Sequence, residues 1–125
     1  MLHLGRGAGY YTAIAAELVG SVGRITAVEI NTKLAERARA ALALWPQVTV
    51  SNAEAPALPS IRSMSSVSAG ATHPLQSWLD ALKPSGRLVF PMTARSNGFG
   101  TMLFVTRVGP EPAARFLLRV GFIDF

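Results

Sequence analysis

Cysteine is absent from this chain of 125 residues, so no disulfide can stabilise it. Charged residues are few, at 15% of the sequence, whereas 50% of the residues are hydrophobic, which is typical of a globular domain with one core. No apolar run approaches the roughly 18 residues of a membrane-spanning helix, and the first residues lack the pattern of a secretory signal peptide. We therefore expect a single domain, located in the cytoplasm and not associated with a membrane.

Basic residues exceed acidic ones, with twelve Lys and Arg against seven Asp and Glu and a net charge of +5. Such an excess can favour an acidic partner, for example nucleic acid. The arginines are scattered, however, and no basic run or alternation of basic and aromatic residues is present. We therefore do not expect nucleic acid as a partner, and we predict no metal site.

Strand and helix patterns alternate along the chain. Strands are predicted at residues 1–4, 23–30, 47–51, 86–92, 101–108 and 113–125, and helices at 11–20, 31–45 and 74–83. Gly20 is the expected end of the first helix, and Asn31 or Thr32 the expected N-cap of the second, which Pro46 stops. Its buried face should consist of Leu34, Ala38, Ala41 and Leu42. This order predicts an α/β fold, Rossmann-like and doubly wound, with a mostly parallel sheet of about six to seven strands and helices on both faces.

Three glycines stand at alternate positions, Gly5, Gly7 and Gly9, between the first strand and the first helix. A glycine turn at this point lets a ligand approach the backbone because no side chain intervenes. Glu29 follows 20 residues after Gly9, at the end of the second strand, where an acid can accept hydrogen bonds from ribose hydroxyls. The ligand is therefore expected to be a nucleoside derivative, although a tight turn and a solvated acid would give the same pattern.

The glycine spacing separates two kinds of nucleoside ligand. A dinucleotide site requires Gly-x-Gly-x-x-Gly, and in this chain Tyr10 occupies the position of the third glycine. This disfavours NAD. The alternate spacing is similar to the first motif of class I S-adenosylmethionine-dependent methyltransferases.

Longer stretches make the resemblance specific. The sequences GRGAGYYTA, GRITAVEIN, LAERARAAL, AGATHP, WLDALKPSGRLVFP and TMLFVTR, in this order, resemble the protein-L-isoaspartate O-methyltransferase family. The resemblance implies an enzyme that transfers a methyl group from S-adenosylmethionine to a carboxylate of damaged aspartyl residues in proteins or peptides, leaving S-adenosylhomocysteine. It also implies cofactor contacts at Gly5, Arg6, Gly7, Gly9, Tyr10, Glu29, Ile30, Glu54, Ala69 and Gly70.

In these contacts, the glycines would border the methionine part of the cofactor, Glu29 would hold the ribose and Ile30 would lie against the adenine. Glu54 would lie near the adenine amino group, although an exposed loop acid would look the same in the sequence. No catalytic side chain is predicted, because the substrate carboxylate has an ordinary pKa of roughly 4 and is already an ionised nucleophile at neutral pH. His3 is therefore interpreted as a packed strand residue and His73 as a solvated loop residue.

Two features depart from the family pattern. The chain lacks the segment that the family carries before the glycine turn, so we expect a fragment truncated at the N-terminus. Its last predicted strand stops abruptly at Phe125, which would fit truncation at the C-terminus as well. The residues Arg62 to Ser66 stand where the family has a buried strand, and serines suit such a strand poorly. A local frameshift is one hypothesis for this stretch, because a frame shifted by two bases can encode Ile-Asp-Val-Ile there. We expect these residues to occupy the strand position nevertheless.

Two alternatives remain open at this stage. The same fold hosts methyltransferases of RNA and of small molecules, so the acceptor could differ. A non-catalytic remnant that binds the cofactor weakly or not at all is the second alternative. The oligomeric state is not predicted.

Overall fold

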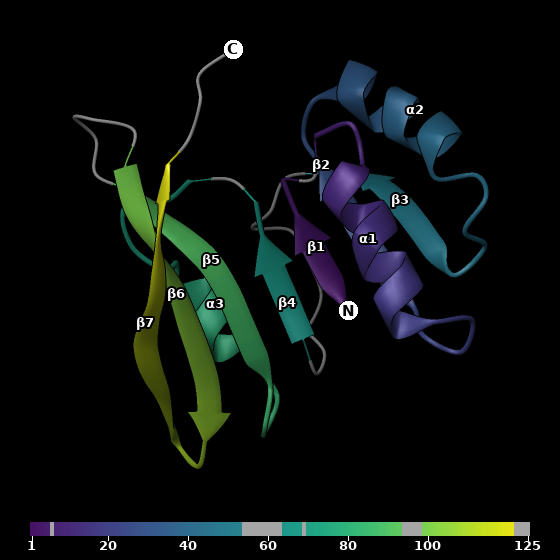
Figure 1. Ribbon diagram of the computed structural model, residues 1–125. Helices are drawn as coiled ribbons and strands as arrows, with labels where there is room; N and C mark the ends of the chain where they lie inside the picture. Colours follow the sequence, from purple (N-terminus) through teal and green to yellow (C-terminus); the bar gives the residue numbers. More distant parts are fainter. Residues whose placement is uncertain (6, 54–63, 69, 94–98, 122–125) are drawn as a thin grey trace. The chain divides into compact units, whose positions relative to one another are not determined.

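The computed structural model describes residues 1–5, 7–53, 64–68, 70–93 and 99–121 (Figure 1). The chain divides into two compact units, Met1–Leu58 and Pro59–Phe125. In the described part of the chain, no helix combines the length and the apolar character needed to cross a membrane.

The first unit alternates strands and helices. It contains β1 (Leu2–Leu4), α1 (Tyr10–Val19), β2 (Ile25–Glu29), α2 (Thr32–Ala41) and β3 (Val48–Asn52). β2 lies between β1 and β3 and pairs with both in parallel, with Glu29 opposite Asn52 at the end of the ladder (Figure 1). Parallel pairing brings the carboxyl ends of the three strands to one edge of this sheet. The glycine turn, Glu29 and Asn52 therefore share that edge.

Small side chains line the helix faces that pack on these strands. α1 packs against β2, and α2 packs against β2 and β3. Ala16 on α1 and both Ala35 and Ala38 on α2 have no exposed surface, and Ile25 on β2 is 1% exposed. An alanine allows the helix backbone to approach the sheet closely, and each large apolar side chain withdrawn from water contributes about 1.5–3 kcal/mol. This packing of α1 and α2 holds the strands of the first unit in place.

The second unit contains four strands and a short helix. They are β4 (Met64–Val67), α3 (Gln76–Asp80), β5 (Arg87–Thr93), β6 (Phe99–Val108) and β7 (Glu111–Gly121). β4 pairs with β5 in parallel, whereas β6 is antiparallel to both β5 and β7. Its core includes Leu88 and Phe90, both without exposed surface, and the Trp78 ring meets Phe90 edge-on at 5.8 Å between centroids. The hairpin of β6 and β7 supplies the antiparallel part of a mostly parallel fold.

The serine-rich stretch does reach a strand, as predicted. Met64, Ser65 and Ser66 lie on β4, in register with Arg87, Leu88 and Val89 of β5. Ser65 has no exposed surface, and its hydroxyl finds no hydrogen-bond partner among the described residues. The strand therefore forms with an unpaired polar group in its buried layer, which costs about 1–3 kcal/mol. Arg62 and Ser63 lie outside the described residues.

Most predicted elements are confirmed, and Asn31 is the N-cap of α2, since its Oδ1 accepts a hydrogen bond from the Leu34 N–H at 3.1 Å. Gly20 ends α1 with a φ of 67°, and its N–H donates to the Ala16 carbonyl. The last predicted strand is confirmed as β7 up to Gly121, and residues 122–125 lie outside the described residues.

Two predicted helix ends are wrong. α2 ends at Ala41 and not at residue 45, because the chain tightens into a turn in which the Trp45 N–H donates to the Leu42 carbonyl at 3.0 Å. The indole Nε1 of Trp45 then donates to Oε1 of Glu17 on α1 at 2.6 Å, a tertiary contact that periodicity does not reveal. Similarly, α3 spans only Gln76–Asp80, because Leu82 and Gly86 form turn hydrogen bonds with Leu79 and Lys83.

The buried face of α2 is also shifted from the predicted one. Ala41 is exposed, whereas Ala35, which was not predicted, has no exposed surface. The buried row runs through Ala35, Ala38 and Leu42, at spacings of three and four residues. Leu34 is half-buried at its margin.

Candidate functional site

The turn after β1 is built from glycines in a left-handed backbone conformation. Gly5, Gly7 and Gly9 have φ angles of 65°, 55° and 100°. Residues with a side chain rarely adopt these angles, so glycine is favoured at each of these three alternate positions. The turn is joined to β2 because the Gly5 N–H donates to the Val28 carbonyl at 3.1 Å. A turn with glycine at alternate positions therefore leads directly into α1.

Gly7 and Gly9 differ in what surrounds them. Among the residues that the structure describes, a Cβ atom added at Gly7 would meet no heavy atom within 4 Å, so the backbone there is open on that side. A Cβ atom at Gly9 would lie 3.1 Å from Cδ1 of Leu42, so the turn packs closely on α2 at that point. The lack of a side chain at Gly9 therefore lets the turn pack against Leu42, whereas at Gly7 it leaves room for a ligand.

Glu29 joins the end of β2 to the glycine turn. Its side chain is 6% exposed, and both carboxylate oxygens accept hydrogen bonds from backbone N–H groups. Oε2 accepts from Gly7 at 3.0 Å, and Oε1 accepts from Asn31 at 3.0 Å. A carboxylate offers about four lone-pair positions, so each oxygen retains capacity for another donor. Hydroxyl groups of a ligand over the turn could use that capacity.

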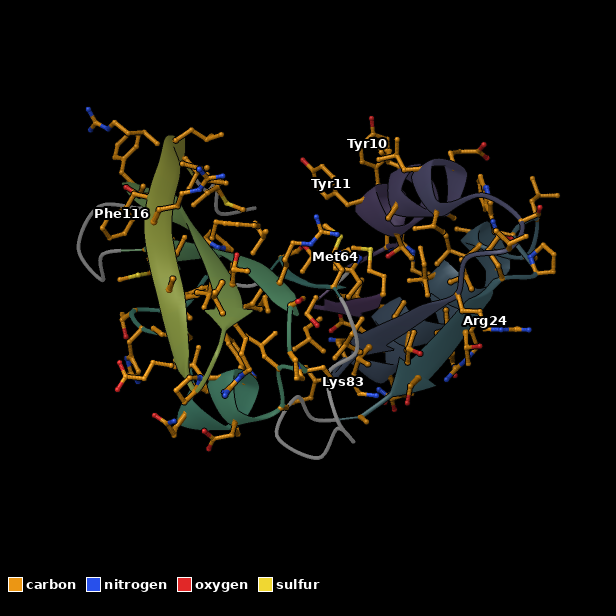
Figure 2. All side chains as sticks on the ribbon, turned by 90° about the horizontal axis from the view of Figure 1, so that it is seen from below. Tyr10, Tyr11, Arg24, Met64, Lys83 and Phe116 are labelled. Atoms are coloured by element: carbon orange, nitrogen blue, oxygen red, sulfur yellow. The ribbon has the colours of Figure 1, made fainter. Side chains whose placement is uncertain are left out.

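Two large side chains that follow Glu29 and Gly9 in the sequence are exposed. Ile30, the residue after Glu29, is 65% exposed. Tyr10 opens α1 and is 71% exposed, with its ring edge-on to that of Tyr11 at 5.3 Å between centroids. Figure 2 shows both tyrosines projecting outward from α1. The first unit thus places six predicted site residues at the carboxyl ends of its parallel strands: Gly5, Gly7, Gly9, Tyr10, Glu29 and Ile30.

Gly70 belongs to the second unit and follows β4. A Cβ atom there would lie 2.8 Å from Oγ1 of Thr93, so the chain passes close to the end of β5. The next residue, Ala71, donates its N–H to the Pro91 carbonyl at 3.2 Å and accepts from the Thr93 N–H at 3.0 Å. These two hydrogen bonds form a short parallel bridge beside β5, so Gly70 lies after β4 and close to the end of β5. The predicted residues Arg6, Glu54 and Ala69 lie outside the described residues.

The two histidines occupy different environments. His3 is 2% exposed on β1, and its Nδ1 lies 2.8 Å from Oγ1 of Thr12, a buried residue of α1. The interpretation of His3 as a packed strand residue is confirmed. His73 is exposed, and its Nδ1 lies 2.9 Å from Oγ1 of the adjacent Thr72.

Two asparagines at this edge were not predicted as part of the site. Asn31 supplies the second N–H to Glu29 and was predicted only as a cap. Asn52 stands opposite Glu29 at the end of β3. The available signal was its place as the last residue of a parallel strand, since the carboxyl ends of such strands are where ligands bind in open α/β sheets.

Comparison with known proteins gives a family match over nearly the whole chain. Residues 1–123 match the profile of the family described as protein-L-isoaspartate(D-aspartate) O-methyltransferase. A protein-L-isoaspartate O-methyltransferase of Ignicoccus hospitalis is 32% identical over 130 residues, which cover 98% of this chain and 60% of the relative. The chain therefore spans about three fifths of the length of that relative.

Solved structures show the same fold. A protein-L-isoaspartate O-methyltransferase matches 99% of this chain and 41% of its own with a TM-score of 0.86 at 22% identity. A protein of Plasmodium falciparum, described as a candidate member of the same enzyme class and crystallised with S-adenosyl-L-homocysteine, matches 98% of this chain and 63% of its own, with a TM-score of 0.76 at 14% identity. Together with the seven strands described above, these matches confirm the predicted Rossmann-like, mostly parallel fold.

Proposed function

The chain belongs to the protein-L-isoaspartate(D-aspartate) O-methyltransferase family, and we propose that it is the S-adenosylmethionine-binding core of such an enzyme. The reaction we assign is methyl transfer to a carboxylate of damaged aspartyl residues in proteins or peptides, a step of protein repair. The observation that carries the proposal is the hydrogen bond between the Gly7 N–H and Oε2 of Glu29. This bond places a carboxylate next to the glycine turn. A nucleoside that carries a long chain on its ribose needs both features, an acceptor for the ribose hydroxyls and open backbone for the chain.

The described residues fit this cofactor. The open space at Gly7 accepts the chain that joins the ribose to the methionine group, because a Cβ atom there would meet nothing within 4 Å. Glu29 has acceptor capacity left for the two ribose hydroxyls. The exposed Ile30 offers an apolar surface to the adenine ring. Gly5, Gly7, Glu29 and Ile30 would therefore hold the cofactor in the first unit.

The chemistry needs little from side chains. When bound, S-adenosylmethionine supplies a methyl group on a sulfonium, and the substrate carboxylate becomes a methyl ester as the carbon–sulfur bond breaks. The protein's contribution is alignment, and a well-oriented pair of reacting groups can account for about 7–11 kcal/mol of barrier lowering. Glu29 and the glycine turn would hold one reactant, S-adenosylmethionine, since they lie at the carboxyl ends of paired strands of the first unit. No side chain is required to take a proton, because an ionised carboxylate carries none.

Binding tests the core of the proposal. Isothermal titration should detect S-adenosylhomocysteine and S-adenosylmethionine, and NAD should not compete with either. The reason is the missing third glycine of a dinucleotide site, whose position Tyr10 occupies. Binding of NAD, with no response to either sulfur nucleoside, would falsify the assignment.

Activity tests the acceptor. Two peptides of one sequence, with either an isoaspartyl or an aspartyl residue at a single position, should be compared for uptake of a labelled methyl group. We expect transfer to the isoaspartyl peptide alone. Cofactor binding together with transfer to RNA or a small molecule, and not to the peptide, would instead support a different acceptor on the same fold. The cytoplasmic location remains a prediction.

A further inference from the structure

Asn52 holds the turn that follows Glu29. From the end of β3, its Nδ2 donates hydrogen bonds to the Glu29 carbonyl at 2.7 Å and to the Ile30 carbonyl at 3.0 Å. Its Oδ1 accepts a hydrogen bond from Oγ1 of Thr32 at 3.2 Å, so all three interactions agree with one orientation of the amide. One side chain thus connects β3 to the end of β2 and to the first residue of α2.

The peptide group between Ile30 and Asn31 is bound from both of its ends. Its carbonyl oxygen accepts from Nδ2 of Asn52, and its N–H donates to Oε1 of Glu29 at 3.0 Å. The carboxylate then reaches the Gly7 N–H through its other oxygen. A continuous series of hydrogen bonds therefore runs from the amide of Asn52, through this peptide group, to the carboxylate of Glu29 and the glycine turn.

We propose that Asn52 is a positioning residue for the cofactor site, setting the orientation of the Glu29 carboxylate and of Ile30. The hydrogen bond to the Ile30 carbonyl fixes the plane of the peptide group whose N–H binds Oε1 of Glu29, and the hydrogen bond to the Glu29 carbonyl fixes the preceding peptide group. Together they hold the backbone on both sides of Ile30, whose side chain is 65% exposed. The nucleoside part of this proposal rests on the proposed function, whereas the ordering of the turn does not.

A purely structural role would give a different result. If Asn52 only anchored the end of β3, its loss would weaken the whole unit, and amides far from the turn would lose protection together with those near it. If it positions Glu29, the loss should be confined to the amides of Asn31 and Gly7. The Ile25 N–H, bonded to the Gln47 carbonyl at 3.0 Å where β2 and β3 begin, is the reference amide, since it lies at the opposite end of these strands from Glu29 and Asn52.

The experiment measures amide hydrogen exchange and S-adenosylhomocysteine affinity in the same variants. Asn52→Asp keeps the shape and the acceptor for Thr32 but removes both donors, and Asn52→Ala removes them without adding charge. Thr32→Val is the matched control, because it removes only the hydrogen bond to Oδ1. In both Asn52 variants we expect exchange at Asn31 and Gly7 to rise by about tenfold or more, and the dissociation constant to rise by about tenfold, as for a lost hydrogen bond or two. Exchange at Ile25 should be unchanged, and Thr32→Val should alter affinity by less than about threefold.

The outcomes separate this proposal from the proposed function. Unchanged exchange at Asn31 and Gly7, or an equal rise at Ile25, would overturn the positioning role. Local exchange changes with an unchanged dissociation constant would overturn its link to the cofactor. If the unmodified chain binds no sulfur nucleoside, the proposed function fails, and the exchange measurement still decides whether Asn52 orders the turn.

Discussion

The backbone N–H of Gly7 and the Oε2 atom of Glu29 lie 3.0 Å apart in a hydrogen bond that joins two segments 22 residues apart in the sequence. The bond connects the glycine turn after β1 to the carboxyl end of β2. Because Glu29 is only 6% exposed, the interaction is shielded from water and stronger than it would be at the surface. The turn and the acid therefore act as one structural unit, and a change in either should affect both.

Removing the carboxylate should weaken cofactor binding. We expect Glu29→Ala to lower the affinity for S-adenosylhomocysteine by about 1.5–3 kcal/mol, as for lost hydrogen bonds to a charged group. Glu36→Ala is the control, since it removes the same charge from an exposed position on α2 and should leave the affinity unchanged. Titration calorimetry on both variants decides the point. Equal affinities in the two would make Glu29 only a structural acid.

Alanine substitution should reduce mainly stability at Gly9 and mainly ligand binding at Gly7. Gly9→Ala combines a φ of 100° with a contact of 3.1 Å to Leu42, so we expect a loss of roughly 2–3 kcal/mol in the free energy of unfolding. Gly7→Ala meets open space and a φ of 55°, so its cost should be about 1 kcal/mol, but its methyl group would occupy the ligand's path. Denaturant unfolding and calorimetry should therefore rank the variants differently. If Gly7→Ala binds like the unmodified chain, the ligand does not pass over Gly7.

The buried serine of β4 should be a position where substitution stabilises the protein. Ser65 has no exposed surface and an unpaired hydroxyl. Ser65→Ala removes that hydroxyl, and we expect the free energy of unfolding to rise by about 1 kcal/mol. The neighbouring half-buried Ser66 serves as the control, with Ser66→Ala changing stability by less than about 0.5 kcal/mol. A clear loss of stability in Ser65→Ala would contradict the unpaired state of the hydroxyl.

The buried pair of His3 and Thr12 should contribute to the stability of the first unit. Thr12→Val keeps the side-chain shape but removes the oxygen that lies 2.8 Å from Nδ1 of His3, leaving a buried polar atom with one partner fewer. We expect a loss of about 1–3 kcal/mol in the free energy of unfolding. The same substitution at the exposed Thr26 on β2 should cost nothing, because valine favours strands. Matching results for the two variants would mean that the hydrogen bond contributes little.

Local sequence was sufficient for the order of the elements and for much of the site. The glycines at alternate positions predicted a turn, and all three have the positive φ angles that only glycine adopts easily. Glu29 was found from its distance along the chain to the glycine turn, because a strand of fixed rise and a helix of ordinary length bring such an acid to the same sheet edge. The φ angles depend on the residue itself, and the place of Glu29 follows from the regular length of a strand–helix–strand unit, so both can be predicted from the sequence.

Tertiary packing decided the rest. α2 ends at Ala41, and Trp45 beyond it donates a hydrogen bond to Glu17 on α1. The sequence of residues 31–45 does not predict that partner. The amide of Asn52 bonds to two carbonyl groups more than 20 residues earlier in the chain, a contact that exists only after β3 pairs with β2. The positive φ angles of the glycine turn follow from local sterics, and the sequence alone determined them. The end of α2 and the partners of polar side chains depend on which elements become neighbours, and only the folded structure determines them.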